Sequence, residues 1–309
     1  YYSLYDRESV QDGDWYGGVP VWLAAENSGM VTAAFYFVGT EAPVGGVPMT
    51  YWKSFDKDIT GSQRVAQVLE WLKMDEEKRP HLVTLYFEDV DTATHEHGPG
   101  SAQSIESIQR VDGYLDQLLS GVADLPIADE ISIILVSDHG QSDIMEAEPF
   151  ILDSVVDLEG ITEIGHGAVS FLYLADDELA RATAIRDAIN GAWEHGKAML
   201  RAETPPEWKM ADSAAFADLI LVSDPGYLVF STADKAQYAS PGDHGWAPEF
   251  PDMHGFFLAT GPRLPRGLTI PAISVTDVYP LMMDILQLPI TTPIDGDATR
   301  LLPLLKPVE

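Results

Sequence analysis

The stretch 81–100, "HLVTLYFEDVDTATHEHGPG", decides the fold class because it joins an apolar run directly to a polar cluster. Its first seven residues have the character of a buried β-strand. The residues that follow place Asp91 and His95 four positions apart, ahead of a Gly-Pro stop. Open sheets of parallel strands bind ligands beyond the carboxyl ends of their strands. We therefore expect Asp91 and His95 to serve a site where this strand ends.

Apolar runs of the same kind recur along the chain and alternate with helical patterns. Strands are expected at 31–37, 81–87, 131–137, 168–174, 218–223, 227–231 and 255–260, and their unbroken apolar character suits a parallel sheet covered on both faces. Helices are expected at 20–29, 62–73, 104–122, 180–196 and 275–288. This alternation predicts a three-layer α/β domain. Residues 176–215, richer in Ala and charge, form a candidate inserted surface subdomain.

Composition limits the partners and the cofactors. With 309 residues, 46% of them hydrophobic, the chain has enough apolar material for one large α/β domain. A net charge of −31 disfavours binding to nucleic-acid polymers, whose phosphates require Lys and Arg. The absence of cysteine means that any zinc must be held by His, Asp or Glu. No apolar run approaches the roughly 18 residues of a membrane span.

Two further polar clusters stand beside expected strands. "SDHG", with Asp138 and His139, directly follows the strand at 131–137, and "GDHGW", with His244, precedes the strand at 255–260. Alone, each cluster has a plainer interpretation, such as a turn or a salt bridge on a helix surface. Together with Asp91 and His95 they supply two Asp and three His, which are typical ligands of catalytic zinc. Two metal ions about 4 Å apart are the usual clamp for displacement at phosphorus.

Four longer segments of the chain resemble the motifs of a known protein family. The segments are "YFEDVDTATHEHGPG" (86–100), "QRVDGYLDQLL" (109–119), "SDHG" (137–140) and "HGWAPEFPDMHGFFLATGP" (244–262). In this combination and order the chain resembles the nucleotide pyrophosphatase/phosphodiesterase family of the alkaline phosphatase superfamily. The resemblance covers nearly the whole chain and is weakest over 145–215. It implies an alkaline-phosphatase-like α/β/α fold with a mostly parallel central sheet, and zinc-dependent hydrolysis of phosphodiester or pyrophosphate bonds in nucleotide-type substrates.

The same resemblance assigns metal ligands. It implies two Zn²⁺ ions, one held by Asp91, His95 and His244 and the other by Asp138 and His139. In the family the second ion also takes an Asp and a Thr from an N-terminal segment, and that Thr is the nucleophile. No stretch of this chain matches that segment. We therefore expect the nucleophile and the first strand of the sheet upstream of residue 1, as a missing partner segment of the same protein, and "SLYD" (3–6) resembles a stretch that follows it.

The substrate pocket is less well defined by the sequence. The resemblance implies that Tyr51 and Tyr86 stack on a nucleotide base, while plain core tyrosines are the alternative. A phosphatase or phosphonate hydrolase of the same superfamily is a rival function, but the motif loops hold almost no Lys or Arg for a doubly charged phosphoryl group. A non-catalytic, metal-binding relic is the rival from another class. The family and the acidic, cysteine-free composition suggest a periplasmic or secreted bacterial protein.

Overall fold

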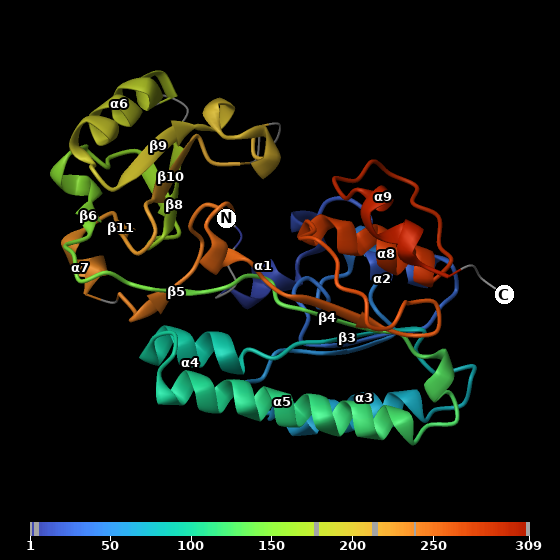
Figure 1. Cartoon of the computed structure of the whole chain (residues 1–309). Helices are drawn as coiled ribbons and strands as arrows, with labels where there is room; N and C mark the ends of the chain where they lie inside the picture. Colours follow the sequence, from blue (N-terminus) through green and yellow to red (C-terminus); the bar gives the residue numbers. More distant parts are fainter. Residues whose placement is uncertain (1, 3–5, 176–178, 212–215, 238, 307–309) are drawn as a thin grey trace. The chain divides into compact units, whose positions relative to one another are not determined.

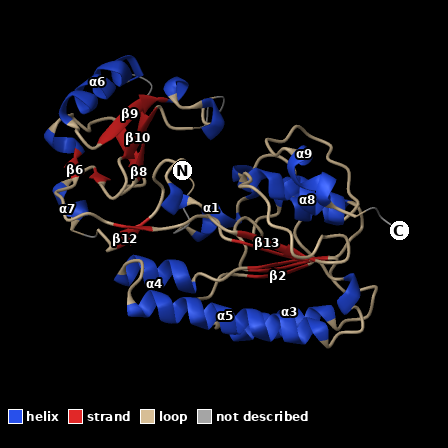
Figure 2. Cartoon of the chain, in the orientation of Figure 1, coloured by secondary structure: helices blue, strands red, loops and turns tan. Residues whose placement is uncertain are grey.

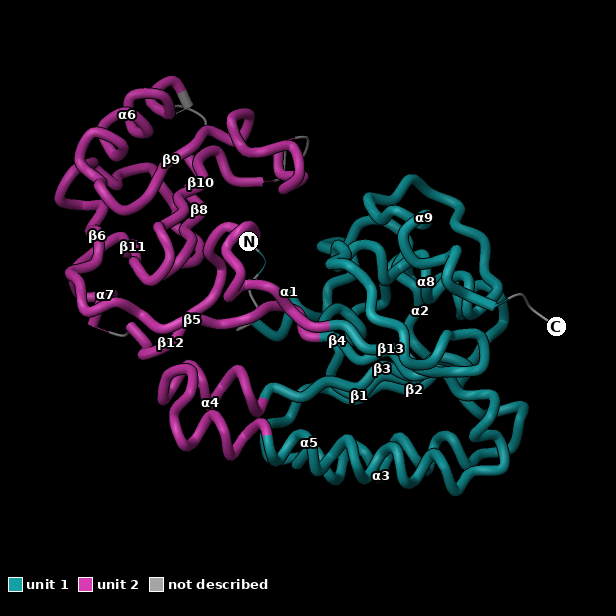
Figure 3. The backbone as a smooth tube through the Cα atoms, in the orientation of Figure 1, with its two compact units in different colours: residues 1–88, 109–136, 257–309 teal, residues 89–108, 137–256 magenta. Residues whose placement is uncertain are grey.

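The computed structural model describes residues 2, 6–175, 179–211, 216–237 and 239–306. Residues 3–5 of the "SLYD" stretch and both ends of the expected insertion at 176–215 lie outside this part. The chain divides into two compact units, one of residues 1–88, 109–136 and 257–309 and one of residues 89–108 and 137–256 (Figure 3). Each unit has its own hydrophobic core.

The first unit contains a parallel sheet and a separate antiparallel pair. Strands β1 (Thr32–Phe35), β2 (Tyr51–Lys53) and β3 (Leu82–Leu85) run parallel in the order β2-β1-β3. Strand β4 (Ile133–Val136) pairs antiparallel with β13 (Phe257–Thr260). Among the strands that the structure describes, β3 has no partner besides β1, and β4 has none besides β13. Each of these two strands therefore has one open edge.

Helices cover both faces of this unit, which makes it a three-layer α/β/α arrangement (Figures 1 and 2). The helices are α1 (Arg7–Gln11), α2 (Val21–Asn27), α3 (Gly61–Leu72), α5 (Ala102–Ala123), α8 (Val278–Ile285) and α9 (Ala298–Leu301), and α5 belongs to this unit from Gln109 onward. Helix α3 begins at a capping box of Thr60 and Gln63 and packs Val68 and Trp71 on β1. Helix α8 packs Leu281 near Ile134 of β4.

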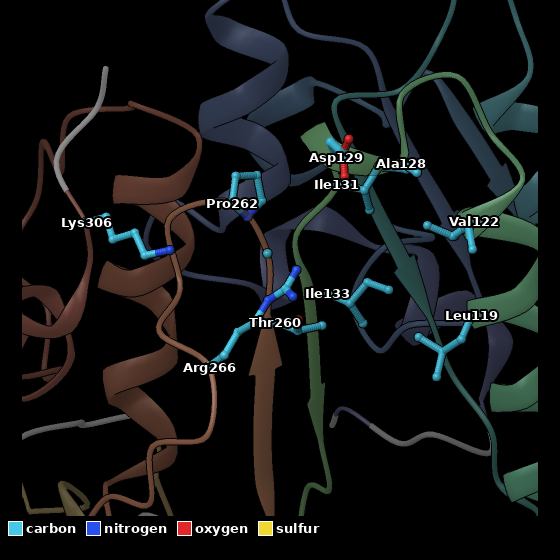
Figure 4. A pocket seen from close by; sticks show the side chains of 12 residues that line it. Leu119, Val122, Ala128, Asp129, Ile131, Ile133, Thr260, Pro262, Arg266 and Lys306 are labelled. Atoms are coloured by element: carbon cyan, nitrogen blue, oxygen red, sulfur yellow. The ribbon is translucent and has the colours of Figure 1, made fainter.

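Helix α5 carries apolar residues that the described chain does not cover. Ile105, Ile108 and Leu119 are 48%, 53% and 49% exposed, although their helical spacing is that of a buried face. Leu119 also lines a cavity of ≈ 400 Å³ where β4 begins, together with Val122 and Ile133 (Figure 4). An open strand edge beside uncovered apolar side chains is a surface that proteins normally pair or cover.

The second unit is built on a four-stranded antiparallel sheet. Its strands are β7 (Ile161–Ile164), β8 (Val169–Leu174), β9 (Gly196–Leu200) and β10 (Leu219–Ser223), and their order in the sheet is β7-β8-β10-β9. Helix α6 (Ala182–Ala192) packs Ile185 and Ile189 on one face of it. Its other elements are α4 (Asp89–His97), α7 (Ala233–Ala236), β5 (Ser142–Asp143), β6 (Phe150–Ile151), β11 (Val229–Phe230) and β12 (Gly242–Asp243).

All seven expected strands are present, but the expected direction of some is wrong. The runs at 31–37 and 81–87 are parallel neighbours, as the sequence predicts. The runs at 168–174 and 218–223 are antiparallel, and so are those at 131–137 and 255–260. Strand β10 is buried along its whole length because side chains pack on both faces of its sheet. A strand covered on both faces is apolar throughout, whichever way its neighbours run. No helix in the described part of the chain is long and apolar enough to cross a membrane.

Candidate metal centre

Helix α4 places the first two candidate ligands on one face. Asp91 and His95 are one turn apart, so their side chains meet, and His95 Nε2 lies 3.4 Å from Asp91 Oδ1. Thr94, on the same helix, is buried and donates its hydroxyl to the Val90 carbonyl. The helix ends at His97; the next residue, Gly98, has a φ of +82°, which glycine adopts readily, and Pro99 cannot continue the helix. The motif that carries Asp91 and His95 is thus a short helix that ends at a Gly-Pro sequence.

The pairing of β5 with β12 brings the other two motifs together. Gly242 is opposite Asp143 and Asp243 is opposite Ser142, so the residues flanking these short strands become neighbours. The ring of His139, before β5, stacks on the ring of His244, after β12, with centroids 3.6 Å apart.

The five predicted metal ligands form one chain of contacts within the second unit. His244 Nε2 lies 3.6 Å from Asp91 Oδ1, and Asp138 Oδ2 lies 3.6 Å from His139 Nε2. Asp91, His95 and His244 each offer a ligand atom within 4.8 Å of the other two, and the described residues contain no other such group of three. The geometry suits a shared cation, while the ligand roles themselves stay a prediction.

Hydrogen bonds fix which imidazole nitrogen faces the cluster. His95 Nδ1 lies 2.9 Å from the Gly242 carbonyl oxygen, and His139 Nδ1 lies 2.9 Å from the Gly140 carbonyl oxygen. A carbonyl only accepts, so Nδ1 carries a proton in both rings, and Nε2 is the nitrogen that faces the neighbouring carboxylate, Asp91 for His95 and Asp138 for His139. Metal-binding histidines are usually held in this way, by a hydrogen bond from the other ring nitrogen.

Two glycines allow the close backbone approaches that these bonds require. A Cβ at Gly242 would lie 2.7 Å from the Thr94 carbonyl oxygen and 2.7 Å from Pro99 Cδ. A Cβ at Gly140 would lie 1.9 Å from the Asp252 carbonyl oxygen. The glycines of "GDHG" and "SDHG" therefore let β12 approach α4, and let the "SDHG" loop approach the segment around Asp252.

Electrostatics keep two of the candidate ligands in the protonation state that a metal requires. Burial, reinforced by the charge of His139, lowers the pKa of His244 to about 4, so this imidazole is neutral near pH 7. Burial alone would raise the pKa of Asp91, but the hydrogen bond and charge of His95 outweigh it and hold that pKa below its ordinary value. In the absence of metal, the hydrogen bond to Asp91 raises the pKa of His95.

Some residues of the centre were not predicted from the sequence. Gln141 donates from Nε2 to Asp91 Oδ1 at 2.5 Å, and its only sequence signal is its place directly after "SDHG". Asp243 accepts from the His244 backbone N–H at 2.9 Å, and burial raises the pKa of its carboxyl group. His166, His97 and His254 are exposed and lie outside the group of three.

The two tyrosines predicted to stack on a base belong to the first unit. The Tyr51 ring stacks on Trp71 at 6.2 Å with 17° between the planes, and Tyr86 packs against the same hydrophobic cluster. Beside them, Arg64 is 1% exposed and makes a two-pronged ion pair with Glu88, at 2.5 and 2.6 Å. The Glu of the "YFED" motif thus has a structural role, and base stacking by the tyrosines stays a prediction.

The α/β/α fold, with its Asp/His motifs following strand ends, defines an alkaline-phosphatase-like protein. The family described as "Type I phosphodiesterase / nucleotide pyrophosphatase" matches residues 1–247, and the chain belongs to this family. The family predicted from the sequence is therefore confirmed.

Individual relatives agree with this placement. Human ectonucleotide pyrophosphatase/phosphodiesterase family member 1 is 28% identical over 310 residues, which cover 97% of this chain and 32% of that protein. A venom phosphodiesterase from Naja atra is 30% identical over 294 residues, covering 91% of this chain and 34% of the relative. The chain thus spans about a third of the length of these curated relatives. The solved structure of murine ectonucleotide pyrophosphatase/phosphodiesterase 5 has the same fold, with a TM-score of 0.88 at 24% identity over 97% of this chain and 78% of that one.

Proposed function

We propose that the protein is a zinc-dependent hydrolase of phosphodiester or pyrophosphate bonds in nucleotide-type substrates. The observation that carries this proposal is the group of Asp91, His95 and His244, which offers one carboxylate and two imidazole nitrogens to a single point. Three ligands of this kind, with a fourth position left for water or substrate, are typical of catalytic zinc. When bound, zinc would polarise the phosphoryl group and lower the pKa of a nucleophilic hydroxyl.

The residues of this chain would hold the two ions and orient the imidazole rings. Asp91, His95 and His244 would hold one ion, and Asp138 with His139 would contribute two ligands to the other. Gly242 and Gly140 orient the imidazoles through their carbonyl groups. The motif loops at 86–100, 137–140 and 244–262 contain no Lys or Arg to meet a doubly charged phosphoryl group, and the ion pairs of these five residues in the described part of the chain are with one another. This favours diesters over monoesters.

The nucleophile is proposed to be a Thr on a segment outside residues 1–309. Two features support a further strand in the first unit: the open edges of β3 and β4, and the half-exposed Leu119 of α5, which lines the cavity where β4 begins. We propose that an Asp and the Thr of that segment complete the ligand set of the Asp138–His139 pair, because two ligands are fewer than zinc usually takes.

Two variants of the full-length protein test the function. His244→Ala should lower the zinc content by about one ion per chain and abolish zinc-dependent hydrolysis of bis(p-nitrophenyl) phosphate. His254→Ala is the matched control, because this exposed imidazole contacts the Pro248 carbonyl and lies outside the cluster. Unchanged zinc content and turnover in His244→Ala would refute the site. Zinc bound without any turnover in the wild type would instead favour a non-catalytic binder.

We also propose that the protein works outside the cytoplasm. The names of the relatives above describe ecto-enzymes and a venom enzyme. A secretion signal in the full-length gene would support this location, and a gene that lacks one would contradict it.

A further inference from the structure

We infer that Gln141 is a positioning residue that sets the orientation of the Asp91 carboxylate for metal binding, an inference that rests on the zinc site proposed above. Gln141 Nε2 donates to Asp91 Oδ1 at 2.5 Å and lies 3.5 Å from the backbone carbonyl oxygen of Asp91. The amide therefore spans the side chain and the backbone of a single residue. This contact joins two motifs that lie 50 positions apart in the sequence.

The amide binds the carboxylate oxygen that faces the cluster. Oδ1 is the atom of Asp91 that lies 3.4 Å from His95 Nε2 and 3.6 Å from His244 Nε2. A carboxylate oxygen can accept more than one interaction, so it can take the amide proton on one side and present electron density to a cation on the other. With Gln141 in place, the carboxylate cannot rotate freely, and Oδ1 is the oxygen it presents to the imidazoles.

The orientation of the amide follows from its surroundings. The reverse orientation would place Oε1, an acceptor, against the carboxylate, which only accepts. With Nε2 toward Asp91, Oε1 is buried and has no hydrogen-bond partner among the described residues. A buried acceptor without a partner costs free energy, so packing alone would favour an apolar side chain here. The donor function is what distinguishes Gln from Leu at this position.

The backbone around Gln141 is held on both sides. On one side, the Gly140 N–H bonds to the Met253 carbonyl at 3.0 Å, in the contact that only glycine permits. On the other side, β5 begins at Ser142 and pairs with β12. Continuing that antiparallel register places position 141 opposite His244. The backbone of Gln141 is thus fixed by hydrogen bonds of its neighbours on both sides. A side chain that orients a metal ligand needs a backbone held in this way.

The test measures zinc affinity in the full-length protein by competition with a chromophoric chelator. Gln141→Leu removes the donor, and Gln141→Met keeps the length of the side chain without a donor or a charge. Both should weaken zinc binding at the Asp91 site by about 10–100-fold, the usual effect of removing a group that orients a ligand. Both should also change the visible absorption of the cobalt-substituted protein. Ser142→Ala is the control, because the Ser142 hydroxyl donates to Asp252 rather than to the cluster, and its affinity should equal that of the wild type.

The outcomes separate this inference from the proposed function. If zinc binding by the wild type is absent or is insensitive to His244→Ala, the proposed function fails. If the wild type binds zinc through His244 and Gln141→Leu binds it equally well, only the role of Gln141 is overturned. Weakened binding in Gln141→Leu with wild-type affinity in Gln141→Met would also overturn it, because the side chain would then act only by filling space. Thermal unfolding of the metal-free variants checks that each one is folded.

Discussion

The Asp91–His95–His244 group and the Asp138–His139 pair contain the same residue types but are built in different ways. The group takes its members from helix α4 and from the end of β12. Hydrogen bonds from Gln141 to Asp91 and from His95 to the Gly242 carbonyl orient two of these members. The members of the pair are adjacent in sequence on one loop, and the Asp138 side chain is 65% exposed. Three donors from two segments would suit a zinc ion, whereas two donors fall short of the usual number. The proposed first position is thus built by pairing within this unit, and the proposed second position would need further ligands.

The largest expected effect separates the two positions directly. His95→Ala should remove the ion at the Asp91 group, with a loss of affinity exceeding the roughly 10–100-fold typical of orienting residues, because a ligand itself is lost. His139→Ala should remove the other ion and leave the first. Zinc titration of each variant would show one remaining site. His97→Ala, an exposed histidine on the same helix, is the control. Loss of both ions in either variant would mean that the two positions form a single cooperative site.

A smaller effect tests how the Asp91 group is supported. In Gly242→Ala the new Cβ would collide with the Thr94 carbonyl and Pro99, so β12 must move away from α4. This movement would break the hydrogen bond between His95 Nδ1 and the carbonyl of residue 242. We expect the free energy of unfolding to fall by about 1–3 kcal/mol, as for other overpacked contacts, and zinc binding to weaken. Urea denaturation and chelator competition measure the two effects.

The matched control for Gly242→Ala is Gly191→Ala in helix α6, where an added Cβ meets nothing within 4 Å. Gly191 lies in the last turn of the helix without a positive φ, so this Gly→Ala change should stabilise the protein by roughly 0.4–1 kcal/mol and leave zinc affinity unchanged. If Gly242→Ala behaves like this control, the close approach of β12 to α4 does not orient His95.

The sequence predicted the positions of the main strands well and their directions less well. The unbroken apolar runs located β1, β3 and β10 because core strands need apolar side chains on both faces. The same property concealed the antiparallel pairing of β8 with β10, since coverage by α6 and by the cluster around Trp208 has nothing to do with strand direction. The short strand β2 was missed because its burial is slight and its run is brief.

The candidate ligands could be predicted, but their supports could not. Asp91, His95, Asp138, His139 and His244 stand in motifs whose residue types already suggest metal chemistry, and the structure gathers them in one unit. Gln141 has no such pattern, because a hydrogen bond between residues 50 positions apart depends on how two loops fold together. The aromatic residues Tyr51 and Tyr86 show the opposite problem, since a core residue and a base-stacking residue have the same appearance in a sequence.

The most direct test is anomalous diffraction at the zinc edge from crystals of the full-length protein. Two peaks are expected. One should lie about 2.0–2.2 Å from an oxygen of Asp91 and from Nε2 of His95 and His244. The other should lie at similar distances from Asp138 and His139, with a Thr oxygen from outside residues 1–309 beside it. A protein that binds zinc elsewhere, or shows no peak between Asp91, His95 and His244, would contradict the proposed metal centre.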